Sequence, residues 1–186
     1  TVLEVVVGAL GSDLVVKPAQ GGSAQGVTIV ESAEQLPRAM VDAYTYAEVA
    51  LIEQRVRGVE VAVTIIDDEN GPRALPAVEI VPTEGVYSFE ARYNAGETTF
   101  FAPARLSDAS AAAVAEAAVI AHETLGLAHI SRIDFIVDEN AQPVFLEANA
   151  LPGLTETSSA PLAIDAAGLD VAVLFDHLAR RAVARA

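Results

Sequence analysis

The sequence has 186 residues, 52% of them hydrophobic and 20% charged, which is enough for one ordinary core or two small lobes and argues against disorder. Its 11 lysines and arginines stand against 26 aspartates and glutamates, and this net charge of -15 argues against nucleic acid or an anionic membrane surface as a partner. The absence of cysteine excludes disulfides, thiolate metal sites and a cysteine nucleophile.

The N-terminal stretch TVLEVVVGALGSDLVV has no basic region of the kind that begins a signal peptide, and it is too short and too broken to span a bilayer. We therefore expect a cytoplasmic protein. Because the sequence starts without Met and only a short stretch precedes its first motif, we expect it to be a piece of a longer chain.

Runs of apolar and β-branched residues between turn signals predict short strands. These runs cover residues 14–16, 27–30, 49–53, 59–66, 74–81, 130–138 and 143–150. The turn-forming DDENGP between the fourth and fifth runs predicts a hairpin, and the turn at 139–142 predicts another between the last two.

Capping residues mark the predicted helices. Ser32, with Gln35 three residues later, predicts a helix that continues to about Ala43. Ser107 predicts the start of an alanine-rich helix that ends near Gly126. Two more helices are expected over 160–167 and 170–185, and a loop over 87–96. Antiparallel hairpins combined with helices predict the α+β class.

The most informative pattern is a polar set within the last two predicted strands, Arg132, Asp134, Glu147 and Asn149. Alternation places each strand's pair on one face, so pairing of the strands brings the four side chains together. Carboxylate and amide oxygens suit magnesium, and the arginine beside them could hold a phosphate. A solvated polar face with a surface salt bridge is the alternative, but acids within such apolar strands favour function.

A glycine-rich loop over 19–26 follows Lys17 at the end of the first predicted strand. Gly21, Gly22 and Gly26 allow backbone N–H groups to approach an anion, and Ser23 adds a hydroxyl donor. The loop matches neither a Walker A nor a dinucleotide fingerprint. The tip of an ordinary glycine-rich hairpin would have the same composition.

Other candidates are weaker on their own. Glu53 and Glu60 flank the turn at Gly58 and could accept hydrogen bonds from adenine and ribose, although ordinary strand-edge acids would look alike. Arg92 and Tyr93 could close over phosphates as a lid, or be ordinary loop residues.

The three histidines, His122, His129 and His177, have no metal-ligand spacing and are expected to be packing or surface groups. No Ser-His-Asp arrangement or GxSxG elbow is visible, so the sequence does not support hydrolysis through an acyl-enzyme.

Taken in order, these motifs resemble the ATP-grasp region of D-alanine–D-alanine ligases. The resemblance rests on VVKPAQGGSAQGVTIV, ALIEQRVRGVEVAV, EARYNAGETTFFAPA, SRIDFIVD and FLEANALPGLTETS, and it covers nearly the whole chain. It implies two small lobes with antiparallel sheets and flanking helices around a nucleotide cleft. Residues 1–58 would be the remainder of the central subdomain, and 59–186 the C-terminal subdomain.

The resemblance also implies how ATP is held. Lys17 would contact phosphate and Ser23 would lie in the loop that covers the triphosphate, while Glu53 and Glu60 would accept hydrogen bonds from the adenine amino group and the ribose. The other implied contacts are Gln54, Val56, Arg92, Tyr93 and Leu146. Arg92 stands where the family usually has lysine, which keeps the charge but changes the geometry.

For the reaction, the resemblance implies that Arg132 steadies an acyl phosphate and that Asp134, Glu147 and Asn149 bind magnesium. Glu147 would bridge two Mg²⁺ ions, with Mn²⁺ as the alternative metal. The second amino acid would be held by the backbone N–H of Gly153 and by Ser158 and Ser159. Arg132, Gly153 and Ser23 are thus the implied catalytic groups.

The implied activity is ATP-dependent joining of two D-alanines through an acyl phosphate, a step in making peptidoglycan precursor for the cell wall. The resemblance does not include the family's N-terminal domain, so we expect the isolated chain to be inactive and its parent to be the ligase. Family members are commonly dimers, so the resemblance allows a homodimeric parent. The alternatives are a non-catalytic nucleotide-binding module, or a divergent ligase for another carboxylate–amine pair or for D-alanine and D-lactate. Two departures from the usual motifs are Ala24 in the glycine loop and Ala150.

Overall fold

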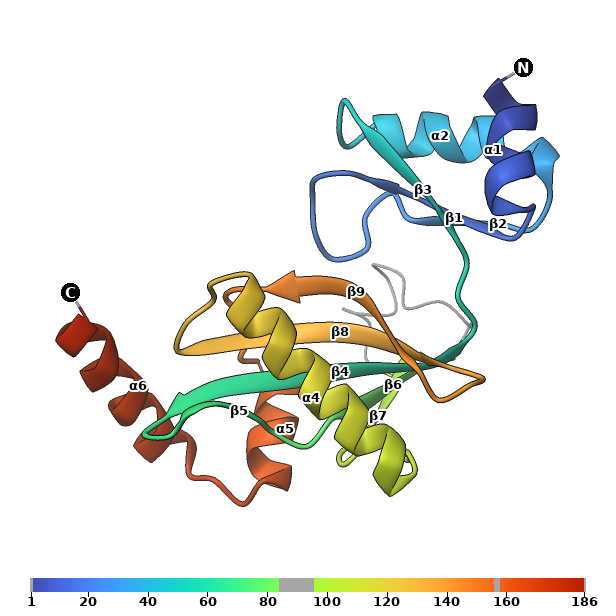
Figure 1. The fold of residues 1–186 in the computed structure, drawn as a ribbon. Helices are drawn as coiled ribbons and strands as arrows, with labels where there is room; N and C mark the ends of the chain where they lie inside the picture. The colour runs from blue at the N-terminus through green and yellow to red at the C-terminus, as the bar shows by residue number, and fades with distance from the viewer. Residues whose placement is uncertain (1, 84–95, 156–157, 186) are drawn as a thin grey trace. The chain divides into compact units, whose positions relative to one another are not determined.

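The chain forms two antiparallel sheets, each packed against its own helices (Figure 1). The computed structural model describes residues 2–83, 96–155 and 158–185. Two compact units are distinguished, one of Thr1–Val56 with Pro82–Thr98 and the other of Arg57–Val81 with Thr99–Ala186. The subdomain boundaries expected from the resemblance stay a prediction.

The smaller sheet has the strand order β2-β1-β3, and helices pack against one of its faces. Its elements are α1 (Val2–Leu10), β1 (Leu14–Pro18), β2 (Thr28–Val30), the 3₁₀ turn η1 (Ala33–Gln35), α2 (Leu36–Tyr44) and β3 (Ala50–Gln54). Leu14 and Val16 point to the helices and are fully buried against Leu36 and Ala43. By alternation, Val15 and Lys17 lie on the opposite face.

Helix α1 is an element that the sequence pattern does not predict. Its stretch is rich in valine, whose branched side chain lowers helix propensity. Leu3, Val6 and Leu10 nevertheless recur at helical spacing, and all three pack against the core of the smaller sheet. Tertiary packing therefore outweighs the local preference here.

The larger sheet has the order β7-β6-β4-β8-β9, with β5 paired to β4. Its strands are β4 (Gly58–Asp68), β5 (Gly71–Ala74), β6 (Val78–Pro82), β7 (Thr98–Phe101), β8 (Ile130–Asp138) and β9 (Pro143–Asn149). Its helices are α4 (Asp108–Thr124), α5 (Ser159–Ala166) and α6 (Val171–Arg185).

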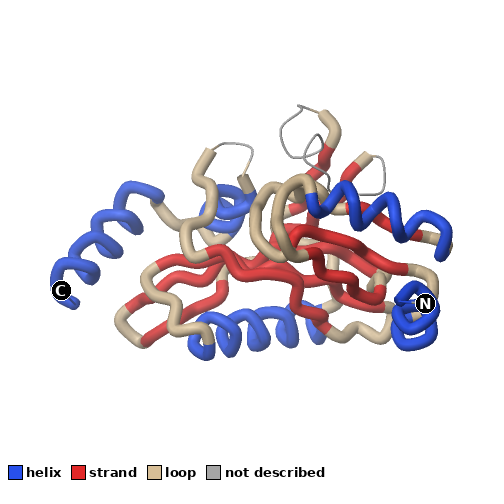
Figure 2. The backbone as a smooth tube through the Cα atoms, turned by 90° about the horizontal axis from the view of Figure 1, so that it is seen from above, coloured by secondary structure: helices blue, strands red, loops and turns tan. Residues whose placement is uncertain are grey.

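Both faces of the larger sheet carry apolar cores because its central strand β4 is apolar at successive positions. On one face Val61, Val63 and Ile133 pack against α4, and on the other Ile66 packs against α5 and α6. Figure 2 shows α4 and α5 on opposite sides of these strands. Any functional group on this sheet must therefore lie on a surface that one of these helices leaves open.

Most predicted elements are confirmed. The run 59–66 pairs antiparallel with β6, which lies in the run 74–81, and β8 pairs antiparallel with β9. Strand β5, which also pairs with β4, begins at Gly71 within the stretch predicted as a turn and shares only Ala74 with the predicted run. Ser107 caps α4 by accepting a hydrogen bond from the Ser110 N–H at 3.1 Å, and Gly126 ends that region with a φ of 64°. The short strand β7 was not predicted.

Of the predicted loop 87–96, only Gly96 is among the described residues. Within the described ranges, no helix is both long and apolar enough to cross a membrane.

Candidate functional site

The pairing of β8 with β9 brings together the polar set that the sequence singled out. Arg132 lies directly opposite Asn149, and Asp134 lies directly opposite Glu147. Opposed residues on one face of an antiparallel pair have Cβ atoms about 5 Å apart. The predicted convergence of a guanidinium, two carboxylates and an amide is therefore confirmed as a geometric arrangement.

The arginine and the aspartate of this set form a two-pronged ion pair. The Arg132 Nε and Nη2 atoms each lie 2.7 Å from a different carboxylate oxygen of Asp134. The Arg132 side chain is 14% exposed and the Asp134 side chain is 6% exposed, so both are largely buried. The Glu147 side chain is 50% exposed. Glu147 Oε1 lies 3.6 Å from Arg132 Nη2 and accepts a hydrogen bond from Asn149 Nδ2 at 3.2 Å.

This set suits a hard divalent cation. Magnesium prefers one or two carboxylates together with phosphate oxygens and water, and it rarely occupies a cage made of protein ligands alone. Among the residues that the structure describes, no cluster of three or more histidine or acidic side chains could hold a metal. A site of two carboxylates and one amide, completed by a ligand's phosphates, fits that chemistry.

Glu60 belongs to the same face of the sheet. In the β4–β8 pairing, Glu60 lies opposite Ile136 and Ala62 lies opposite Asp134. Side chains alternate, so Glu60, Asp134 and Arg132 share one face, while Ile133 packs towards α4 on the other. The predicted ribose acceptor and metal ligands thus share a face that α4 does not cover.

Leu146 occupies an irregularity in β9. The register runs from Asp134 opposite Glu147 to Phe135 opposite Phe145, which leaves Leu146 as the extra residue. Such a bulge bends a strand and redirects its side chains. The Phe135 and Phe145 rings meet edge to face at 6.1 Å on the next rung.

The predicted acceptor loop lies between β9 and α5. A Cβ atom on Gly153 would come within 2.9 Å of Ser158 Oγ, so these two predicted substrate residues are neighbours. Ser158 is the N-cap of α5, and its hydroxyl lies 2.9 Å from that of Thr155. Ser159, the third candidate, is only 6% exposed.

In the smaller unit, Lys17 and Glu53 form an ion pair with an Nζ–Oε2 distance of 2.6 Å. Their strands pair with Val15 opposite Glu53 and Lys17 opposite Leu51, so both charged side chains lie on the face away from α1 and α2. The predicted phosphate and adenine ligands therefore share the open face of one small sheet.

The glycine-rich loop connects β1 to β2 as predicted. Ser23 and Ala24 both have positive φ, at 56° and 55°, and Gly26 follows at 71°. A Cβ atom on Gly26 would lie 2.6 Å from the Tyr46 ring, so glycine is needed there for space as well as for conformation. Successive N–H groups in such turns can form a concavity for anions.

The remaining nucleotide candidates are Gln54, Val56, Arg92 and Tyr93. Gln54 ends β3, and Val56 lies two residues later, before the unit boundary. Arg92 and Tyr93, the predicted lid residues, lie outside the described residues.

One polar cluster of serine, histidine and aspartate forms in the fold although no such arrangement is visible in the sequence. His122 Nδ1 lies 2.7 Å from Ser131 Oγ, and its Nε2 lies 3.4 Å from Asp67 Oδ1. Ser131 is 0% exposed and His122 is 2% exposed, so no substrate can reach this hydroxyl. The three residues come from α4, β8 and β4, and no local motif could have revealed them.

Comparison with known proteins assigns the family. The sequence model described as "D-ala D-ala ligase C-terminus" matches residues 1–180. The D-alanine–D-alanine ligase of Anaeromyxobacter dehalogenans (strain 2CP-C) is 41% identical over 178 residues, which cover 92% of this chain and 56% of the relative. The chain thus spans about half the length of the curated relatives it matches.

Solved structures agree with this assignment. The VanG D-Ala:D-Ser ligase from Enterococcus faecalis superposes with a TM-score of 0.83 at 25% identity, covering 95% of this chain and 51% of that one. The D-alanine–D-alanine ligase from Bacillus anthracis complexed with ATP gives a TM-score of 0.72 at 26% identity, covering 94% and 52%. The fold is ATP-grasp, as predicted, and the chain belongs to the D-alanine–D-alanine ligase family, of which it corresponds to the C-terminal part.

Proposed function

We propose that this chain is the ATP- and magnesium-binding part of a cytoplasmic ligase that joins two D-alanine molecules for peptidoglycan synthesis. The observation that carries the proposal is the face of the larger sheet where Arg132 and Asp134 meet Glu147 and Asn149 across two rungs. Family membership supplies the substrate class.

The proposed reaction has two steps. A carboxylate oxygen of the first D-alanine attacks the γ-phosphorus of ATP, the bond to the β,γ-bridging oxygen breaks, and ADP leaves. The amine of the second D-alanine then attacks the carbonyl carbon of the acyl phosphate. Phosphate departs with the bonding electrons, the nitrogen loses a proton, and the dipeptide remains.

The larger unit would supply charge and positioning for both steps. Asp134, Glu147 and Asn149 would hold magnesium, which when bound neutralises charge on the phosphate oxygens. The Arg132 guanidinium, kept in place by Asp134 at 2.7 Å, would contact the transferred phosphoryl group. Ser158 at the N-cap of α5, beside Gly153, would receive the carboxylate of the second amino acid, because a helix N-terminus favours an anion.

The smaller unit would bind the nucleotide. Lys17 and the backbone of the glycine loop would contact the phosphates, with Ser23 as a further donor. Glu53 would accept the adenine amino group, while the backbone groups of Gln54 and Val56 would line the base. We also assign Arg92 and Tyr93 to a lid, Glu60 to the ribose and Leu146 to the base site.

Release of ADP by the full-length protein tests the proposed reaction. With D-alanine and ATP, we expect ADP, phosphate and the dipeptide in equal amounts. ADP formation that does not depend on D-alanine, or no ADP at all, would overturn the assignment.

The length of the chain favours a second proposal, which concerns the activity of the isolated 186 residues. Because they span about half the length of the ligases to which they are similar, we propose that they bind ATP with magnesium but do not turn it over. Calorimetry with Mg-ATP, run beside an ADP-release assay, separates binding from catalysis. Turnover by the isolated chain would contradict this second proposal.

The second substrate differs among proteins of this fold, since one structural relative is a D-Ala:D-Ser ligase. A competition assay with D-alanine, D-serine and D-lactate, scored by the product formed, decides among the three. We expect D-alanine to be preferred, as in the relatives named D-alanine–D-alanine ligase.

A further inference from the structure

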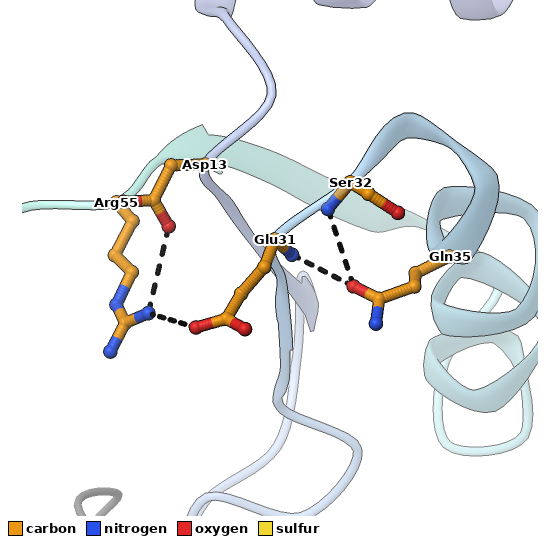
Figure 3. Close-up of polar contacts among 5 residues, drawn as sticks. All are labelled: Asp13, Glu31, Ser32, Gln35 and Arg55. Atoms are coloured by element: carbon orange, nitrogen blue, oxygen red, sulfur yellow. Dashed lines mark hydrogen bonds and ion pairs between the residues drawn. The ribbon is translucent and has the colours of Figure 1, made fainter.

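Arg55 joins the ends of all three strands of the smaller sheet (Figure 3). Its Nη1 atom lies 3.6 Å from Asp13 Oδ1 and 3.4 Å from Glu31 Oε1. Asp13 immediately precedes β1, Glu31 immediately follows β2, and Arg55 immediately follows β3. One guanidinium therefore connects the start of the central strand with the ends of both its neighbours.

The backbone supports the same junction. The β1–β3 pairing ends with Leu14 opposite Gln54, and the Arg55 N–H then donates to the Asp13 carbonyl at 3.0 Å. The Arg55 side chain is 19% exposed, although Glu31 is 69% exposed. An arginine that is mostly covered and held at backbone and side chain has little freedom to move.

This anchor lies between two groups assigned to the adenine base. Gln54 and Val56 are proposed to contact the base through their backbones, and Arg55 is the residue that joins them. We propose that Arg55 is a positioning residue for the base: it fixes the backbone of Gln54 and Val56 by tying the end of β3 to the β1–β2 hairpin. The inference rests on the proposed nucleotide site.

The position of Arg55 predicts a selective effect. The glycine loop connects the far ends of β1 and β2, whereas Asp13 and Glu31 lie at the near ends. At about 3.3 Å per residue, the five residues of β1 separate the anchor from the loop by roughly 16 Å. Loss of the anchor should therefore disturb the base and leave the phosphates unaffected.

Calorimetry on the 186-residue chain with Mg-ATP, Mg-GTP and inorganic triphosphate tests this. For Arg55→Met we expect ATP affinity to fall about three- to tenfold and the ATP-over-GTP ratio to fall with it, while triphosphate affinity stays unchanged. Arg55→Lys keeps the charge but not the planar fork, and should recover part of the loss. Arg38→Met, which removes an exposed pair with Asp42 in the same unit, is the matched control and should change none of the three.

Glu31→Gln is a second variant that breaks the contact with Arg55, and because this side chain is exposed, the change carries little risk to folding. It should lower ATP affinity less than Arg55→Met, and the double variant should show no further loss, because both changes break one interaction. If Arg55→Met fails to fold, Glu31→Gln and Arg55→Lys carry the same test of base selection.

The outcomes distinguish this inference from the function on which it rests. A wild-type chain that does not bind Mg-ATP would overturn the proposed function and the inference together. Wild-type binding with an unchanged ATP-over-GTP ratio in the folded variants, or an equal loss of triphosphate affinity, would overturn the role of Arg55 alone.

Discussion

Glu79 on β6 is a carboxylate that is only 6% exposed, and Arg105 holds it through three hydrogen bonds. The Arg105 side-chain hydrogen bonds keep the pKa of Glu79 below its ordinary 4.5, against the opposing effect of burial. The Arg105 guanidinium also lies 3.6 Å from the centre of the Phe101 ring. These contacts tie the segment after β7 to the sheet.

We expect Glu79→Gln to lower the free energy of unfolding by about 1 to 3 kcal/mol at pH 7, because it removes the charge of a nearly buried carboxylate and leaves the Arg105 guanidinium without its charge partner. Arg105 is 58% exposed, which keeps the effect at the lower end of that range. Since the folded pKa is the lower one, the contribution is fully present above the unfolded pKa and is lost as pH falls through the folded pKa. Urea unfolding from about pH 7 to pH 3 measures it.

Glu116→Gln, an exposed change on α4, is the control and should show little difference from the wild type at any pH. A Glu79→Gln deficit that is the same at acid and neutral pH would contradict an electrostatic origin.

Gly58 in β4 and Gly8 in α1 differ in the space that is available for a Cβ atom, so their alanine variants should change stability in opposite directions. A Cβ atom on Gly58 would lie 2.0 Å from the Val137 carbonyl oxygen, and that oxygen belongs to the paired strand β8. Gly58→Ala must therefore push β4 and β8 apart, and we expect it to lower the free energy of unfolding, measured by thermal unfolding, by about 1 to 3 kcal/mol. A Cβ on Gly8 in α1 meets nothing within 4 Å. Gly8→Ala should therefore raise the free energy of unfolding by about 0.5 to 1 kcal/mol, because alanine favours the helix more than glycine does.

The buried network of Asp67, His122 and Ser131 joins β4, α4 and β8, and its members should depend on one another. Ser131→Ala leaves His122 Nδ1 without its hydroxyl partner, which should cost about 1 to 3 kcal/mol. Replacing both, with His122→Leu as the second change, should cost less than the sum of the two single variants. Strict additivity in chemical denaturation would show that the 2.7 Å contact is not an energetic unit.

Elements with a clear period or cap could be predicted from the sequence, and those that depend on distant packing could not. Alternation predicted that Arg132 and Asp134 share one face of their strand and that Glu147 and Asn149 share one face of theirs. It could not predict the register shift at Leu146, without which Asp134 would lie opposite Leu146 instead of Glu147. The helix α1 was missed since valine disfavours helices locally, and its packing partners lie far along the chain. The His122 network was missed for a related reason, because three separate elements must fold before its atoms meet.

At the scale of the whole molecule, the net charge of -15 allows two effects of magnesium to be separated. Excess negative charge destabilises a compact state, so sodium chloride alone should raise the melting temperature by screening. At equal ionic strength, magnesium with ATP should raise the melting temperature by a further increment. The corresponding gain in the free energy of unfolding is about 2.7 kcal/mol when the ligand is at one hundred times its dissociation constant.

Glu147→Gln isolates the specific part of that increment. The change removes one carboxylate that is half exposed, and one unit of charge out of the total should barely alter the response to sodium chloride. The increment from magnesium with ATP should fall sharply, because the amide is a neutral and weaker ligand than the carboxylate. Thermal melts of both proteins in matched salts measure the two responses together. A variant that keeps the whole magnesium-dependent increment would remove Glu147 from the metal site and leave Asp134 and Asn149 as its remaining candidates.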